Sequence, residues 1–167
     1  MADFVSKKCF ELLDPLLNCT VIYAKPNAPR PQAPYATIDV ISRKRLGLYD
    51  ERSQGTDVDG NIDITSQKEG VITVEYFGDD AEEALEILLD DLNRQSIRDK
   101  MTINMFQISR MGQVKDLTGL FASVNYEPRA TVDLHFRYST TIKDNVGIIE
   151  TPIIESEFSG GVQPETN

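Results

Sequence analysis

The sequence predicts a single α+β domain, in which two α-helices pack on one face of an antiparallel or mixed β-sheet. Three observations support this fold class. Residues 81–92 carry an apolar stripe at helical spacing, residues 130–138 alternate between apolar and polar side chains, and residues 71–77 are dense in β-forming side chains. Because both patterns occur in one chain without an internal repeat or a separating linker, we expect one shared core.

Length and composition are those of an ordinary globular domain. The chain has 167 residues, of which 40% are hydrophobic and 26% charged. A domain of this size buries roughly two-thirds of its unfolded surface, so it needs no metal or disulfide for stability. Cys9 and Cys19 are too few for a disulfide framework and lack zinc-ligand spacing, so we expect two reduced, largely buried thiols. We expect no cofactor.

The first element is predicted to be a helix that stops or kinks near Asp14, because the following Pro15 disfavours helical backbone at that position. Its apolar residues recur at three- and four-residue spacing: Val5, Cys9, Leu12, Leu13 and Leu16. A short strand is expected over residues 20–23.

A proline-rich segment follows at residues 25–34, where four prolines favour an extended arm. It is either a stiff connector or an arm presented to a neighbouring subunit. Residues 35–46 then read as a strand with Ile38 and Val40 on one face. The basic residues at its far end, 43–45, indicate a solvated strand end rather than a DNA-binding patch.

Residues 49–60 are polar and contain glycine, which predicts a long loop. Residues 62–65 alternate in polarity and residues 71–77 are rich in β-formers. The intervening residues 67–70 end in glycine, so we expect a β-hairpin with its turn there.

The second helix is predicted after Asp79, whose spacing from Glu82 matches a capping box. Arg94 and Arg98 are placed toward its end, as the helix dipole prefers. Its apolar stripe comprises Ala81, Ala84, Leu85, Leu88, Leu89 and Leu92. The acidic residues beside the stripe indicate a solvated helix face rather than a metal site: Glu82, Glu83, Glu86, Asp90 and Asp91.

The remaining chain reads mainly as strands. Phe106 and Ile108 indicate one strand, residues 120–124 a further apolar segment, and residues 130–138 a strand with one buried face. Residues 146–155 are expected to form a final strand. We place the domain at residues 1–155 and a flexible tail at residues 156–167.

The sequence offers little for catalysis, and we expect no enzymatic activity. The single histidine, His135, falls on the polar face of a predicted strand without a recognisable partner. The chain also lacks the glycine-rich phosphate loops and the G-x-S-x-G nucleophile pattern.

One segment partly resembles a calcium-binding loop. Asp57, Asp59 and Asn61 have the spacing of an EF-hand interior, with Gly60 between them. In that alignment Gly55 and Ser66 replace the first carboxylate and the bidentate glutamate. A polar loop with an Asp-Gly turn is therefore the preferred interpretation, and we expect no metal.

The formal charge of −10 argues against a sequence-reading nucleic-acid binder, although it suits a surface that DNA passes without adhering. No segment approaches the roughly 18 apolar residues of a membrane span, and the first residues do not resemble a signal peptide. We therefore expect synthesis in a cytoplasm.

Three stretches, taken in order, resemble the phage neck-terminator or tail-terminator family. They are residues 29–38 (PRPQAPYATI), residues 74–81 (VEYFGDDA) leading into the leucine-rich helix, and residues 126–134 (YEPRATVDL) with VGIIE at 146–150. The resemblance covers nearly the whole chain, from about Phe4 to Glu155.

The resemblance implies a structural virion protein without catalytic residues. It implies a ring, of six subunits, that sits on the last ring of the tail tube, stops tube polymerisation and offers the head connector a docking surface. Its partners would be further copies of itself, the tube protein and connector proteins, with the sheath as a further candidate and DNA passing through the bore. Another neck component, such as an adaptor or head-completion ring, is an alternative, but adaptors are mostly helical. A small calcium-dependent binding module is the other alternative.

Within such a ring, each subunit would place one face against a different face of its neighbour. A stiff proline arm loses little entropy on docking, which makes the proline segment our first candidate for that contact. Arg129 is either an interface partner for a carboxylate or a member of an intrachain ion pair. The candidate interface residues are Pro29, Arg30, Pro31, Pro34, Tyr35 and Arg129.

Overall fold

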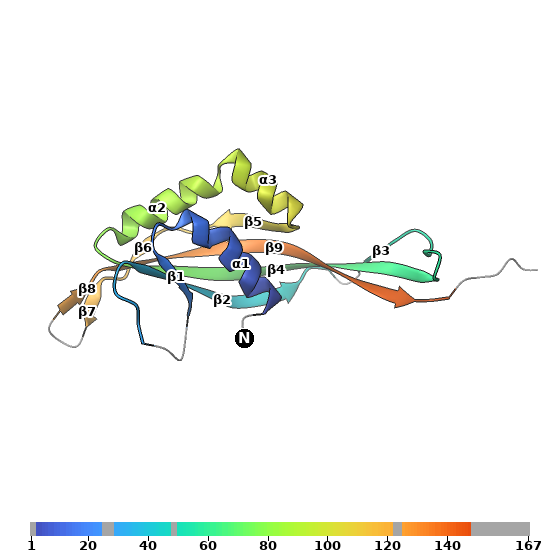
Figure 1. Ribbon diagram of the computed structural model, residues 1–167, viewed down its shortest axis with the longest axis horizontal. Coiled ribbons are helices and arrows are strands. Elements are labelled where there is room, and N and C mark those ends of the chain that lie inside the picture. The colour runs from blue at the N-terminus through green and yellow to red at the C-terminus, as the bar shows by residue number, and fades with distance from the viewer. Residues whose placement is uncertain (1–2, 25–28, 48–49, 122–124, 148–167) are drawn as a thin grey trace, which may run out of the picture.

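A computed structural model describes residues 3–24, 29–47, 50–121 and 125–147 (Figure 1). Its helical elements are α1 (Phe4–Leu13), the 3₁₀ turn η1 (Asp14–Leu16), α2 (Ala81–Leu92) and α3 (Gln95–Ile103). Its strands are β1 (Thr20–Tyr23), β2 (Tyr35–Arg45), β3 (Glu51–Arg52), β4 (Asn61–Phe77), β5 (Phe106–Met111), β6 (Lys115–Asp116), β7 (Gly119–Phe121), β8 (Asn125–Glu127) and β9 (Arg129–Asn145).

The main sheet is mixed, as predicted. Its strand order is β1-β2-β4-β9-β5, with β3 added beside β4 and β6 beside β9. The β1–β2 pair is parallel, and the other pairs of this sheet are antiparallel. Strands β7 and β8 form a separate two-stranded sheet. The α+β class is therefore confirmed.

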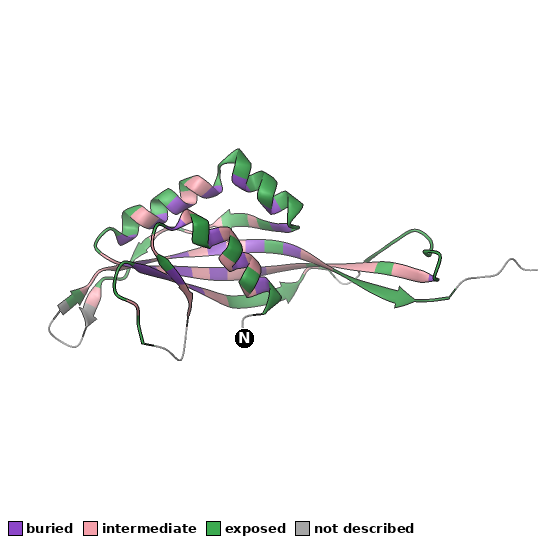
Figure 2. Ribbon diagram, viewed as in Figure 1, coloured by how far each residue is buried: buried purple, intermediate pink, exposed green. Residues whose placement is uncertain are grey.

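One face of the main sheet carries the core, because three helices pack on it (Figure 2). Alternate residues of β9 from Ala130 to Tyr138 point into this core, which confirms the predicted alternation. Helices α1, α2 and α3 supply Cys9, Leu88 and Met101, among others, to the same cluster. We call the opposite face, which these helices leave uncovered, the open face.

The prediction of two helices is corrected to three. Helix α3 buries only Ile97 and Met101, one turn apart. Two apolar anchors among polar residues give a weak helical pattern, so its helical state depends on packing against β5 and α2.

Helix α1 ends as predicted. It stops at Leu13, and the chain continues as a 3₁₀ turn that contains Pro15. At its start, the Asp3 carboxylate accepts a hydrogen bond from the Ser6 amide at 2.9 Å, which caps the helix. The hydrogen bond from the Ser6 amide, followed by that from the Arg43 guanidinium, lowers the pKa of the Asp3 carboxylate.

The predicted hairpin over residues 62–77 is wrong, because β4 runs through the expected turn as one strand of 17 residues. It pairs with β9 along its whole length, from Asn61 opposite Asn145 to Phe77 opposite Arg129. Gly70 lies in the middle of the strand, where a Cβ atom would stand 2.5 Å from the Phe136 ring. The glycine therefore marks a close approach, not a turn.

The predicted capping box of the second helix is also wrong. Helix α2 begins after Asp80, and no side-chain hydrogen bond caps it. Gly78 turns the chain here, with φ +151°, so Asp79 lies outside the capping position. The helix ends at Leu92, so Arg98 belongs to α3 instead. The apolar stripe is confirmed: Ala81, Leu85, Leu88 and Leu92 are buried, and Ala84 and Leu89 are half-buried.

The outer parts of β4 and β9 extend beyond the helix-covered body (Figure 1). We call this hairpin, formed by residues 61–66 and 140–145, the hairpin arm. Within these residues no side chain is buried, and Ile142 is 61% exposed. The loop expected over residues 49–60 leads into the arm and includes the short strand β3.

Several predictions fall wholly or partly outside the described residues. They are the beginning of the proline segment at 25–28, the apolar residues 122–124, the final strand over 148–155 and the tail over 156–167. No helix in the described part of the chain has both the length and the apolarity needed to cross a membrane.

Candidate subunit interface

The end of the proline segment is held against the open face of the sheet by Arg30. Its Nη1 atom lies 2.7 Å from Oε1 of Glu127, and its guanidinium lies over the Phe77 ring, 5.3 Å from the centroid. Pro29 and Pro34 are exposed on either side, and Pro31 is half-buried. The segment therefore presents proline rings outward while one arginine fixes its position.

Tyr35 lies beneath this segment and is only 3% exposed. Its ring stacks on Phe77 with centroids 4.6 Å apart and planes 8° apart. Burial raises the pKa of Tyr35, and its buried hydroxyl has no hydrogen-bond partner among the described residues. Both rings border a cleft of about 500 Å³ on the open face, which Arg30 and Ile41 also line. Tyr35 thus supports the floor of a cleft.

Arg129 lies at the start of β9 and is half-buried. Its Nε donates a hydrogen bond to the carbonyl oxygen of Leu117 at 3.0 Å. Within the described residues Arg129 makes no ion pair, so an intrachain salt bridge, one of the two alternatives for this residue, is not found there. It borders a cleft of about 610 Å³ whose other charged residues are all acidic: Asp79, Asp80, Glu82, Glu83, Glu86 and Asp116.

A second cleft on the open face, of about 590 Å³, is predominantly basic. Four cationic side chains line it, whereas Glu69 is its only lining carboxylate. The cationic residues are Arg43, Lys44, Arg110 and Arg137. Lys44 lies 2.9 Å from the Glu69 carboxylate and Arg137 lies 3.6 Å from it, so one anion is shared by two cations. We call this region the basic cleft.

The basic end of β2 is solvated, as predicted. Arg43, Lys44 and Arg45 are all exposed. Arg43 pairs with Asp3 at 2.5 Å, and Arg45 pairs with Asp50. These pairs lower the pKa of Asp50 and contribute to the lowered pKa of Asp3. Adjacent side chains of a strand point to opposite faces, so the three do not form one patch, although Arg43 and Lys44 both reach the basic cleft.

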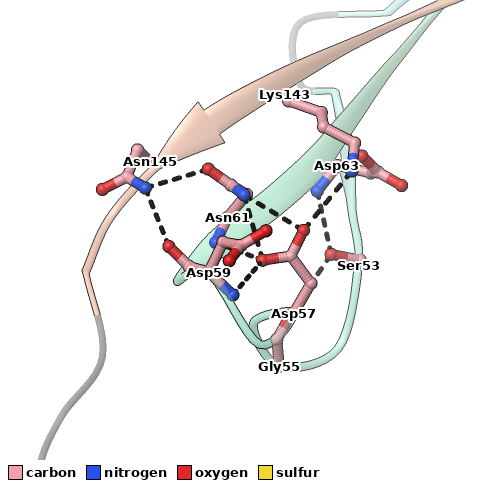
Figure 3. Close-up of polar contacts among 8 residues, drawn as sticks. All are labelled: Ser53, Gly55, Asp57, Asp59, Asn61, Asp63, Lys143 and Asn145. Atoms are coloured by element: carbon pink, nitrogen blue, oxygen red, sulfur yellow. Dashed lines mark hydrogen bonds and ion pairs between the residues drawn. The ribbon is translucent and has the colours of Figure 1, made fainter.

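The turn that precedes the hairpin arm is organised by Asp57 (Figure 3). Its Oδ1 accepts hydrogen bonds from the backbone amides of Asp59 and Asn61, at 3.0 and 2.8 Å. The Asn61 side-chain amide donates to both carboxylate oxygens, and Lys143 lies 3.3 Å from Oδ2. Asn145 in turn donates to the Asp59 carbonyl and the Asn61 side chain.

This geometry supports the preferred interpretation of the Asp57–Asn61 loop. N–H donors surround the Asp57 carboxylate, and Gly60 completes the turn with φ +77°. A cation would have to displace these donors. Among the described residues no group of three His, Cys, Asp or Glu side chains is arranged to hold a metal ion.

The hydrogen bonds lower the pKa of Asp57 to about 2, the backbone amide of Asn61 contributing most. Because this pKa is below the ordinary aspartate value of 3.8, the ionised carboxylate stabilises the folded state above about pH 4. That contribution is lost as the pH falls from about 4 to about 2. We expect Asp57→Asn to destabilise the protein relative to wild type at pH 5, with a difference that shrinks toward pH 3.

Urea unfolding at pH 5, 4 and 3 measures this difference. Asp59→Asn is the matched control, because the Asp59 carboxylate accepts no hydrogen bond within the described residues and only its backbone takes part in the turn. A difference between wild type and Asp57→Asn that stays constant from pH 5 to pH 3 would contradict the assignment.

His135 lies on the open face, half-buried at the edge of the basic cleft. In the described part of the chain, no carboxylate or hydroxyl is hydrogen-bonded to its imidazole. Its backbone carbonyl accepts a bond from Ser109. The arrangement lacks the oriented base expected of a catalytic histidine.

The two cysteines are free thiols on the helix-covered side. Burial raises the pKa of Cys9 to about 12 and also raises that of Cys19. Neither is a reactive thiolate.

A family model described as phage neck terminator protein matches residues 3–159. The chain belongs to the phage neck terminator family. No curated protein matches it. The resemblance inferred from the three sequence stretches is therefore confirmed, and the protein is a structural component of the neck of a phage tail.

For this neck terminator, the predicted interface residues divide by position. Arg30 and Tyr35 both line the first open-face cleft, whereas Arg129 borders the acidic cleft instead. The sequence did not identify Phe77 and Glu127 as the residues that hold Arg30. It also missed the basic cleft, because β2, β5 and β9 contribute its cations from distant positions in the chain.

Proposed function

We propose that this neck terminator forms a ring, of six subunits, that ends the tail tube and joins it to the head connector. DNA passes through the bore without sequence-specific binding. The observation that carries the proposal is the family match, which covers all of the described residues. Assembly of the subunits takes place in the host cytoplasm.

The open face supports the proposed contact between subunits. The helices cover one face of the sheet, so the other face, with its two clefts, remains for neighbours. In this proposal Pro29, Pro31 and Pro34 contact the next subunit, while Arg30 and Tyr35 hold them in place. Stiff rings fixed before docking lose little entropy, which favours association.

Arg129 has a different role in the proposal. It lies beside six carboxylates of its own chain, which makes the surface around it strongly negative. A partner of opposite charge, such as a basic surface on the tube or connector, would be attracted to this side. A negative lining would also keep DNA moving through the bore, because it repels phosphate.

Disruption of the gene is expected to produce overlong or headless tails beside filled, tailless heads. Without a terminator, tube polymerisation has no end point and the connector lacks a docking surface. Electron microscopy of lysates from the disrupted and parental phages measures tail length and the fraction of heads joined to tails. Expression of the wild-type chain in trans is the control and should restore both quantities.

Tails of normal length joined to heads in the disrupted phage would contradict the proposal. Overlong tails that remain joined to heads would limit the role to termination and remove the joining function.

A further inference from the structure

We propose that the hairpin arm of one subunit inserts its acidic tip into the basic cleft of the next copy of this chain. The inference rests on the proposed ring and names a second contact within it. It follows from the uncovered arm, the order of its tip and the opposite charges of tip and cleft.

The arm is long for a structure without its own core. At about 3.4 Å per residue, six residues of each strand extend about 20 Å, and no helix covers either face. An isolated two-stranded hairpin is marginal in water. Apolar side chains also face solvent there, since Val58 is 89% and Val146 56% exposed. Burial of these side chains against a partner would stabilise the contact.

The tip is nevertheless well ordered. Asp57 binds the backbone and side chain of Asn61, and Asn145 joins the two strands at their end (Figure 3). On the other side, Ser53 accepts a hydrogen bond from the Asp63 amide at 3.0 Å. A tip held in one conformation loses little entropy when it docks.

Three carboxylates at the tip are exposed and unpaired within the described residues: Asp59, Asp63 and Asp144. The Asp57 carboxylate is by contrast neutralised by Lys143. The basic cleft has an excess of positive charge. Arg110 has no ion-pair partner in the described part of the chain, and Lys44 and Arg137 share the single carboxylate of Glu69. On a chain of net charge −10, this is a marked concentration of positive charge.

The cleft cannot receive the tip of its own chain. Lys44 lies opposite Glu69 on β4, eight positions from Asn61 where the arm ends. Eight residues of strand span about 27 Å, so the tip lies at one end of β4 and the cleft lies beside its middle. Contact between them therefore requires a second copy, placed head to tail, as in a ring.

Charge reversal tests the contact. We expect Asp59→Lys with Asp144→Lys, and separately Arg110→Glu with Arg137→Glu, each to lower the yield of heads joined to normal-length tails by at least about tenfold, because like charges then meet. The four changes combined should restore the yield. The control is Glu11→Lys with Asp90→Lys, which reverses two exposed charges on α1 and α2 and should leave assembly unchanged.

A second readout is a zero-length carbodiimide cross-link in intact virions, read by peptide mass spectrometry. Lys44 joined to Asp59 or Asp144 is expected, and the length of the arm excludes such a link within one chain. Thermal unfolding of each purified variant verifies folding.

Failure of the combined variant to regain function while it stays folded, together with no cross-link to Lys44, would overturn the contact. So would normal assembly in both double variants. If only the Arg110 and Arg137 changes impair infection, and tails remain of normal length, the cleft contacts a polyanion such as DNA and the proposal is wrong. Overlong tails on gene disruption would still support the terminator function in each case.

Discussion

Leu88→Ala is expected to lower the free energy of unfolding by about 2–5 kcal/mol, because it leaves a cavity in the tightly packed core. Leu88 is 0% exposed and lies on α2, where this helix crosses β9 and β4. The total stability of such a domain is about 5–15 kcal/mol, so one substitution removes a large share of it. Equilibrium urea unfolding followed by circular dichroism measures the change.

Ile87→Ala is the matched control, since Ile87 is the adjacent residue of the same helix and is 49% exposed. Ile87→Ala should lower the free energy of unfolding by well under half the amount that Leu88→Ala does. Equal losses for the two variants would mean that the buried face of α2 is assigned incorrectly.

Gly70→Ala is expected to lower the free energy of unfolding by about 1–3 kcal/mol, the usual range for overpacking a core. A Cβ atom would stand 2.4 Å from the Ser42 carbonyl oxygen and 2.5 Å from the Phe136 ring, and Phe136 is fully buried. Urea unfolding again measures the loss. Gly119→Ala is the control, because its Cβ would meet nothing closer than 3.7 Å.

Gly70 also distinguishes the continuous strand β4 from the hairpin that the sequence predicted. If Gly70 ended a turn, alanine there would be tolerated and no coupling to Phe136 would exist. In the continuous strand, Phe136→Leu makes room for the new methyl group, so the loss from Gly70→Ala should be smaller in that background. Independent, additive effects of the two substitutions would contradict the packing.

The structure separates the two faces of the sheet by role. Three helices cover one face, and the apolar side chains buried between these helices and the sheet form the core. The open face holds the proline segment at one cleft and the cations at the other, so both proposed contacts use surfaces that folding leaves free. This arrangement fits a structural protein of the phage neck.

Elements with a strong local pattern could be predicted from the sequence. The stripe of α2, the alternation of β9 and the proline that ends α1 each act within one element, so periodicity and backbone sterics were sufficient. The order of three short stretches was likewise sufficient to indicate the family.

Features that depend on contacts between distant residues could be recognised only in the folded chain. In the sequence Gly70 indicates a turn, but in the structure it makes room for the Phe136 ring. Helix α3 has too few buried apolar residues to be recognised without its contact with β5. Arg30 meets Glu127, and four cations from different strands form one cleft. Strand pairing sets these neighbours, and a local pattern cannot specify which distant side chain will fill the space beside it.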